Sequence, residues 1–158
     1  MTPFQKKVFQ ILQIFTQICD QLQLKYFLVC GSALGAVKYG GFVPWDDDVD
    51  VALFRNDYER FCKEAPALLP EQLFLQNFQS DPAFPAIYSK LRNSETACIE
   101  ESVAALPINH GISIDIFPLD GYPTDKKEQE RLERKKAWFV RKLSIPCVFV
   151  LSDGRKRL

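Results

Sequence analysis

The chain has 158 residues, 47% of them hydrophobic, and its 20 basic residues balance its 20 acidic residues. This length and apolar content suffice for one domain with a substantial core. The zero net charge argues against bulk electrostatic binding to nucleic acid or to an acidic membrane, so any nucleotide contact has to be local.

The thiols and the single histidine, His110, do not form a zinc motif, because close cysteine pairs are missing. We expect buried free thiols, and we leave His110 out of the catalytic set. The N-terminal residues carry several glutamines and no long apolar block, so we expect neither a signal peptide nor a spanning helix, and a reducing cytoplasm fits best. The cysteines are Cys19, Cys30, Cys62, Cys98 and Cys147.

The first element is a helix that begins with a capping box, Thr2-Pro3-Phe4-Gln5, with proline at the first helical position. Apolar residues then recur at helical spacing over about five turns, so we expect this helix to pack against the core. These residues are Phe4, Val8, Ile11, Leu12, Phe15, Ile18, Cys19 and Leu22.

Residues 26–30 are a short apolar run that predicts a central strand. Gly31 and Ser32 then form a tight turn into a helix that includes Lys38. Backbone N–H groups at such a helix start can hold a phosphate, with Ser32 as N-cap or ligand and Gly31 allowing close approach. A Gly-Ser pair alone is a weak indication, since most such pairs are only turns.

Four aspartates follow a loop over residues 38–44, and Trp45 before them either walls an acidic site or anchors the core. On a strand, Asp48 and Asp50 share one face, Asp46 joins them by parity as a support residue, and Asp47 points away. Two such charges about 4 Å apart repel by roughly 4 kcal/mol at an effective dielectric of about 20. Protonation, a nearby Lys or Arg, or a divalent cation has to offset this repulsion. Oxygen ligands favour a hard ion such as Mg²⁺.

Further along, we predict a helix over residues 55–65 that Pro66 stops, and a strand over residues 73–75. Residues 87–92 alternate as a half-exposed strand does, which places Tyr88, Lys90 and Arg92 on one face. If that face adjoins the aspartates, Lys90 and Arg92 hold phosphate oxygens; otherwise they are solvated surface charges. Residues 96–99 are expected to return as a hairpin partner.

Residues 112–117 form the second informative strand, with isoleucines on one face and Asp115 on the other. If this strand lies beside the first acidic strand, Asp48, Asp50 and Asp115 converge on one cation site. A charged helix is then expected over residues 124–142, followed by an apolar run over residues 145–151.

Two blocks of the sequence carry a family resemblance. The first comprises residues 31–32 (GS), 34–37 (LGAV) and 41–51 (GFVPWDDDVDV), and the second is GISIDIFPLD at residues 111–120. Together they resemble the LicD family, a branch of the nucleotidyltransferase-fold superfamily. The Pro-Trp-Asp-Asp-Asp run is specific, whereas the Gly-Ser pair belongs to the whole superfamily.

This resemblance implies an α+β fold, a nucleotidyltransferase-like mixed sheet flanked by helices, in a single domain over residues 1–158. Members of the family usually continue further, so we expect a domain truncated at its C-terminus. The implied activity is transfer of phosphocholine or a similar phosphorylated group from a CDP-activated donor to a cell-surface glycan. The implied metal ligands and catalytic residues are Asp48, Asp50 and Asp115, with Gly31, Ser32, Lys90 and Arg92 binding substrate.

Two other hypotheses stay open. One is a true nucleotidyltransferase that attaches a nucleoside monophosphate to a small acceptor. The other is a shortened domain that binds a nucleotide or a partner without turnover. The sequence does not specify the donor head group, the acceptor or the oligomeric state.

Overall fold

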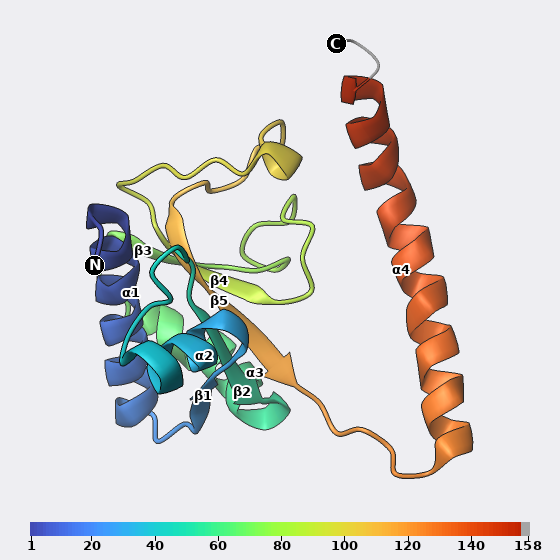
Figure 1. The fold of residues 1–158 in the computed structure, drawn as a ribbon, viewed down its shortest axis with the longest axis horizontal. Helices are drawn as coiled ribbons and strands as arrows, with labels where there is room; N and C mark the ends of the chain where they lie inside the picture. Colours follow the sequence, from blue (N-terminus) through green and yellow to red (C-terminus); the bar gives the residue numbers. More distant parts are fainter. Residues whose placement is uncertain (156–158) are drawn as a thin grey trace. The chain divides into compact units, whose positions relative to one another are not determined.

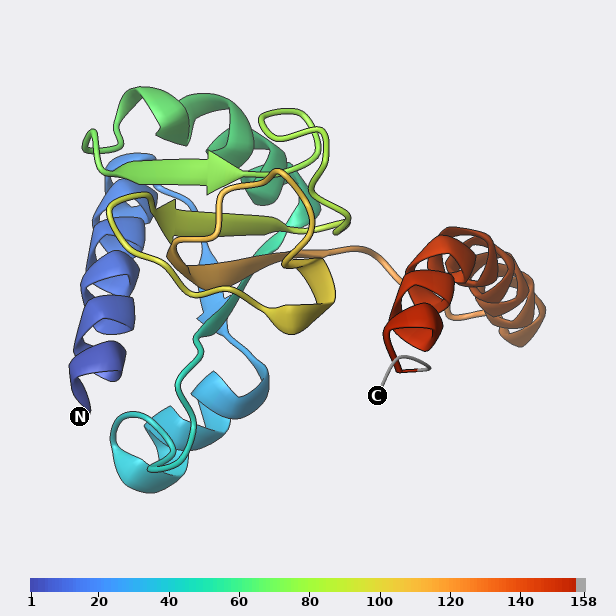
Figure 2. The same ribbon diagram turned by 90° about the horizontal axis from the view of Figure 1, so that it is seen from above.

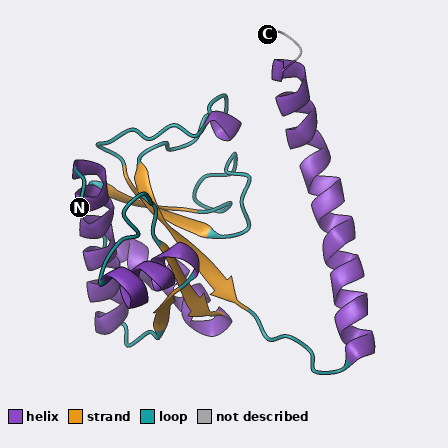
Figure 3. Ribbon diagram, viewed as in Figure 1, coloured by secondary structure: helices purple, strands orange, loops and turns teal. Residues whose placement is uncertain are grey.

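The computed structural model describes the backbone of residues 1–155 and the side chains of residues 1–139, 141 and 142. It has a five-stranded mixed sheet in the order β1-β2-β5-β4-β3 and four α-helices (Figures 1 and 3), which confirms the predicted α+β class. The elements are α1 (Pro3–Gln21), β1 (Tyr26–Leu28), α2 (Cys30–Tyr39), β2 (Asp50–Phe54), α3 (Arg55–Glu64), η1 (Ala65–Ala67), β3 (Leu73–Gln76), β4 (Ser89–Asn93), η2 (Glu101–Val103), β5 (Ile112–Leu119) and α4 (Lys126–Arg155).

The two acidic strands lie side by side in the interior of the sheet, which is the condition for the predicted cation site. Strand β2 pairs with β5 in parallel, and β1 pairs with the other edge of β2 in the antiparallel direction. Strands β3 and β4 complete the sheet on the far side of β5, both in antiparallel pairs. Consequently the residues next to Asp50 and Asp115 come from segments far apart in sequence.

One face of the sheet is apolar and packs against α1 and α3. Alternate residues of β2 and β5, such as Val51, Leu53 and Ile114, are fully buried there. From the helices, Phe15 and Phe61 enter the same cluster with ring centroids 5.1 Å apart. Because strand side chains alternate, this burial sends Asp50 and Asp115 to the opposite face.

The predicted amphipathic helix is confirmed as α1, capping box included. Thr2 Oγ1 accepts from the Gln5 backbone N–H, while Gln5 Oε1 accepts from the Thr2 backbone N–H. Val8, Ile11 and Phe15 are at most 2% exposed and supply the buried side of the helix. The α1 helix therefore packs as core material.

The second face of the sheet is partly covered by the segments before and after β4, which Figure 2 shows looping beside the strands. The η2 turn lies in the longer of these segments, between β4 and β5. This covering explains why Lys90 and Arg92, which belong to the second face, are only 7% and 2% exposed.

Several sequence predictions are corrected. Strand β1 is an edge strand, not a central one, because only β2 pairs with it. Residues 96–99 form no strand; they are tied to the start of β5 by a backbone bond from Cys98 N–H to His110 O and by a bond from Ile112 N–H to Thr96 Oγ1. Trp45 is 80% exposed and therefore no core anchor, and it lies edge-on to Tyr39.

The thiols and the last helix also differ from expectation. Cys19 is a buried free thiol, but Cys30 is exposed, and Cys62 and Cys98 are half-buried. Cys147 lies outside the residues whose side chains are described. The predicted charged helix exists but continues through the apolar run as α4.

Contacts divide the chain into two compact units, Met1–Asp120 and Gly121–Leu158. The sheet, its core and all the predicted site residues belong to the first unit. Within residues 1–155, the structure has no helix both long enough and apolar enough to cross a membrane.

Candidate active site

A row of polar residues crosses the second face of the sheet at one level. In the β2–β5 pair, Asp50 lies directly opposite Asp115, and in the β5–β4 pair Asp115 lies opposite Lys90. Gln76 of β3 lies opposite Lys90 and extends the row. Lateral partners in a sheet are near neighbours on the same face. The structure therefore brings together two of the three predicted metal ligands and one predicted substrate ligand.

The third predicted ligand, Asp48, lies just before β2 in a segment without regular secondary structure, not within the strand. Buried Val49 separates it from Asp50, so the alternation predicted from the sequence holds. The backbone N–H of Asp115 donates to Val49 O at 2.9 Å, which continues the β2–β5 register toward Asp48. Asp48 and Asp50 thus approach the same region from consecutive outward positions.

The start of α2 is attached to the acidic strand through Ser32. Its Oγ accepts the backbone N–H of Asp50 at 2.8 Å. The hydroxyl proton of Ser32 is therefore not used in that bond and can be donated to a ligand oxygen. Val29, the residue before the helix, gives no side-chain cap, and Cys30 has a left-handed φ of 51°.

Gly31 is needed for close packing at this helix start. A Cβ atom added to Gly31 would lie 2.5 Å from Asp46 Oδ2, too close for any real side chain. The Asp46 carboxylate therefore lies against the helix start, where the sequence predicts that a phosphate group binds. The structure places Asp46 among the site carboxylates, and its support role stays a prediction.

The carboxylates interact strongly with one another. Partial desolvation, together with a hydrogen bond and charge repulsion from Asp46, raises the pKa of Asp48 to about 6. Desolvation and the Asp115 charge also raise the pKa of Asp50, an effect that Lys90 partly opposes. Of the three predicted ways to offset the repulsion, the structure shows two, a raised carboxyl pKa and a neighbouring lysine.

Lys90 is the charged partner of Asp115, with Nζ 3.0 Å from Asp115 Oδ1 and 3.0 Å from Glu100 Oε1. Burial by itself lowers the pKa of Lys90, but the two carboxylates, above all Asp115, hold that pKa above its ordinary value. Lys90 therefore stays protonated and neutralises part of the acidic site. The face that carries Lys90 adjoins the aspartates, as the condition requires, and a phosphate-binding role for Lys90 stays a prediction.

Arg92 is on the same face but faces a different set of groups. Its guanidinium donates to Gln76 Oε1 and to Gly111 O, the latter at 2.7 Å. Its Nη2 atom lies 4.0 Å from Glu100 Oε1. Burial lowers the pKa of Arg92. These contacts hold together the start of β5 and the end of β3, and a phosphate-binding role for Arg92 stays a prediction.

Whether a divalent cation fits can be tested on the donor set. Asp48, Asp50 and Asp115 offer only carboxylate oxygens, which suit Mg²⁺, and they repel one another in its absence. Among the described residues, however, no three His, Cys, Asp or Glu side chains converge closely enough to hold a metal ion. The chemistry of the donors fits, and in this structure Lys90 is bonded to Asp115.

A comparison with known families identifies the family of the chain. The sequence model described as "LicD/FKTN/FKRP, nucleotidyltransferase domain" matches residues 23–147, from the residues before β1 into α4. The chain belongs to the LicD family. The match covers every predicted site residue.

Two relatives of this LicD-family chain are bacterial proteins. It is 30% identical over 117 residues to the lipopolysaccharide cholinephosphotransferase LicD of Haemophilus influenzae, covering 74% of this chain and 43% of the relative. It is also 30% identical over 117 residues to an uncharacterized protein of Rickettsia prowazekii, covering 73% of this chain and 40% of that protein. The chain thus spans less than half the length of both relatives.

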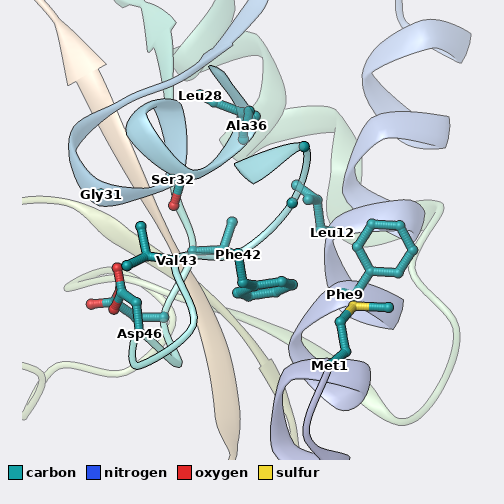
Figure 4. A pocket seen from close by; sticks show the side chains of 14 residues that line it. Met1, Phe9, Leu12, Leu28, Gly31, Ser32, Ala36, Phe42, Val43 and Asp46 are labelled. Atoms are coloured by element: carbon teal, nitrogen blue, oxygen red, sulfur yellow. The ribbon is translucent and has the colours of Figure 1, made fainter. Parts of the chain in front are cut away.

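A pocket of about 300 Å³ adjoins the acidic segment of this LicD-family domain. Figure 4 shows Asp46 and Ser32 toward one end, the Phe42 ring in the middle, and Phe9 and Met1 at the other end. Most of the lining is apolar and comes from α1, α2 and the loop between α2 and β2. The pocket is a concave apolar space beside charged groups, as small-molecule sites commonly are.

Two residues to which the sequence assigns no role belong to the site. Glu100 bonds to Lys90 across ten residues, and no local pattern indicates that contact. Tyr88 lies just before β4, and the alternation of residues 87–92 predicts that its side chain is on the same face as Lys90. The Tyr88 ring stacks on Phe117 at 4.6 Å, and burial and Asp115 raise its pKa to about 12.

Proposed function

We propose that this LicD-family chain is a phosphotransferase that moves a substituted phosphate group, phosphocholine or a close analogue, from a CDP-activated donor to a hydroxyl of a cell-surface glycan. The observation that carries the proposal is the parallel register that pairs Asp50 with Asp115 beside Ser32. The name of the Haemophilus influenzae relative supports the head group. We place the reaction in the cytoplasm.

The carboxylates of Asp48, Asp50 and Asp115 are the residues that would hold Mg²⁺. When bound, the metal would supply positive charge to the donor diphosphate. The phosphate oxygens would lie at the start of α2, where Gly31 leaves room and the Ser32 hydroxyl donates. The Asp46 carboxylate, now against Gly31, would have to turn away.

Asp115 is the residue that we assign as general base. Lys90 bonds to its Oδ1, which orients the carboxylate and leaves Oδ2 to accept a proton. The glycan hydroxyl oxygen forms a bond to the phosphocholine phosphorus, and its proton passes to Asp115. The phosphorus–oxygen bond to CMP breaks, and CMP leaves with the bonding electron pair.

Product analysis tests this proposal. The chain is incubated with Mg²⁺, a bacterial glycan acceptor and CDP-choline labelled separately in choline and in cytidine. We expect choline label in the glycan and cytidine label in free CMP. Cytidine label in the acceptor would instead establish a nucleotidyltransferase. Donor binding without release of CMP would establish a binding domain and overturn the proposed activity.

A further inference from the structure

The acidic segment from Asp46 to Asp50 is held at both ends by side chains of other elements. At its end, Ser32 Oγ accepts the Asp50 N–H. At its beginning, Gln5 Nε2 of α1 donates to the Asp46 carbonyl oxygen at 2.7 Å. We propose that Gln5 is a positioning residue, whose amide fixes Asp46 and thereby holds Asp48 beside Asp50. This inference rests on the proposed function for its effects on metal binding and on turnover.

The capping box alone does not explain a glutamine at position 5. The cap uses the backbone N–H of Gln5 and its Oε1 atom, and a glutamate would serve it equally well. A glutamate would also interact favourably with the helix dipole at this end of α1. Only the amide can donate through Nε2 to Asp46 O, and that donor is what a carboxylate lacks. Gln5 is only 4% exposed, so water does not readily replace the bond.

The other contacts of Asp46 show that this residue is a fixed point. Its backbone N–H donates to Val43 O at 3.0 Å, and its carboxylate lies over Gly31. Only three residues separate it from Asp50, and one of them, Val49, is buried. With both ends held and Val49 packed, little freedom remains for Asp48. Loss of the Gln5 bond releases the first end while Asp50 stays in its strand.

Gln5→Glu tests the role, because it keeps the capping acceptor and removes the donor to Asp46. Thr2→Val is the matched control, since it removes the hydroxyl of the same capping box and does not touch Asp46. We expect Gln5→Glu to weaken Mn²⁺ binding, measured by electron paramagnetic resonance, and Mg²⁺-dependent turnover by about tenfold or more, as loss of an outer support for metal ligands does. Thr2→Val should lower the unfolding temperature and leave both the Mn²⁺ affinity and the turnover near their wild-type values.

A second readout needs neither metal nor activity. Trp45 immediately precedes Asp46 and is exposed, so in a Trp138→Phe background it is the single fluorescent indole. We expect the fluorescence anisotropy of Trp45 to fall in Gln5→Glu and to stay unchanged in Thr2→Val. If Gln5→Glu does not fold, Gln5→Met, similar in length and also without a donor, replaces it in both measurements.

The outcomes separate this inference from the proposed function. Wild-type protein without turnover, together with a fall in Trp45 anisotropy in Gln5→Glu, would reject the proposed activity and retain the positioning role. Equal anisotropy and equal Mn²⁺ binding in wild type, Gln5→Glu and Thr2→Val would show that Gln5 only caps α1. That result would overturn the inference even if the enzyme is active.

Discussion

Asp48 carries a charge that the folded chain disfavours, because its carboxyl pKa is raised to about 6. A raised pKa gives a stabilising contribution below the ordinary value of 3.8, and this contribution is lost as the pH rises through 6. At pH 7 the metal-free protein therefore lacks it. Repulsion within the site is the cost of keeping several carboxylates together.

Asp48→Asn should accordingly stabilise the metal-free protein while abolishing turnover. The side chain is partly exposed and screened by solvent, so we expect a gain of about 1 kcal/mol at pH 7. Urea unfolding in the presence of a chelator measures it, and the gain should vanish below pH 4. Asp47→Asn is the control, because Asp47 is exposed and has the opposite parity. A destabilised Asp48→Asn protein would contradict the proposed repulsion.

Cys19 gives a pH dependence that is independent of the site. Burial raises the pKa of its thiol from 9.0 to about 12, so folding favours the neutral form. Stability from this group is complete below pH 9 and is lost as the pH rises toward 12. Between these values we expect wild type to lose up to about 1.4 kcal/mol per pH unit more than Cys19→Ala. Urea unfolding of both proteins at pH 8 and pH 10 provides the comparison, and parallel losses would contradict it.

At the scale of elements, the start of α2 and the acidic segment depend on each other. Ser32 bonds to the first residue of β2, and Gly31, which has no side chain, leaves room for the Asp46 carboxylate. Helix α2 ends at Gly40, whose φ of 63° suits glycine, and the chain then turns back toward the acidic segment. The short connection thus places a helix start and three carboxylates together.

Gly31→Ala should lower turnover without lowering the stability of the fold. The new Cβ atom fills the space over Gly31 that the phosphate oxygens would need, and it meets Asp46 Oδ2 there, so we expect turnover to fall by about tenfold or more. Alanine also favours the helix, so the unfolding temperature should change little. Gly41→Ala is the matched control, because a Cβ atom added there would meet nothing within 4 Å. Equal activity in the two variants would show that the space over Gly31 is not needed for turnover.

The outward face of the two acidic strands is predictable from the sequence because alternation is a local signal. Val49, Val51 and the isoleucines of residues 112–116 identify one buried face, and the aspartates then occupy the other. The contacts that complete the site are not local: Gln5 bonds to Asp46 across 41 residues, and Lys90 bonds to Glu100 through a loop without periodicity. Such contacts depend on how the elements pack, and no single segment encodes them.

The edge position of β1 is not predicted, because it too depends on how the elements pack. An apolar run indicates burial on both faces, which is typical of a central strand. The residues of β1 are half-buried, and Phe27 gains its cover from Phe54 at 5.2 Å instead of from a second neighbouring strand. Apolar side chains can therefore be covered at an edge.

At the scale of the whole molecule, the core and the site lie within residues 1–120. The bidentate ion pair of Arg55 with Asp120, at 2.6 and 2.7 Å, fastens the end of this unit to α3. We expect a chain of residues 1–123 to unfold cooperatively within a few degrees of the full chain, with the same near-ultraviolet circular dichroism. Loss of the cooperative transition would show that α4 is required for folding and would favour a single domain.

Metal binding tests the central claim most directly. Mg²⁺ is titrated by calorimetry into wild type, Asp50→Asn and Asp47→Asn, each with CDP-choline present. We expect saturable binding in wild type and in Asp47→Asn, and its loss in Asp50→Asn, because Asp50 lies in the central row with Asp115. Binding of equal strength in Asp50→Asn, or no binding in wild type, would contradict a cation centre on this face of the sheet.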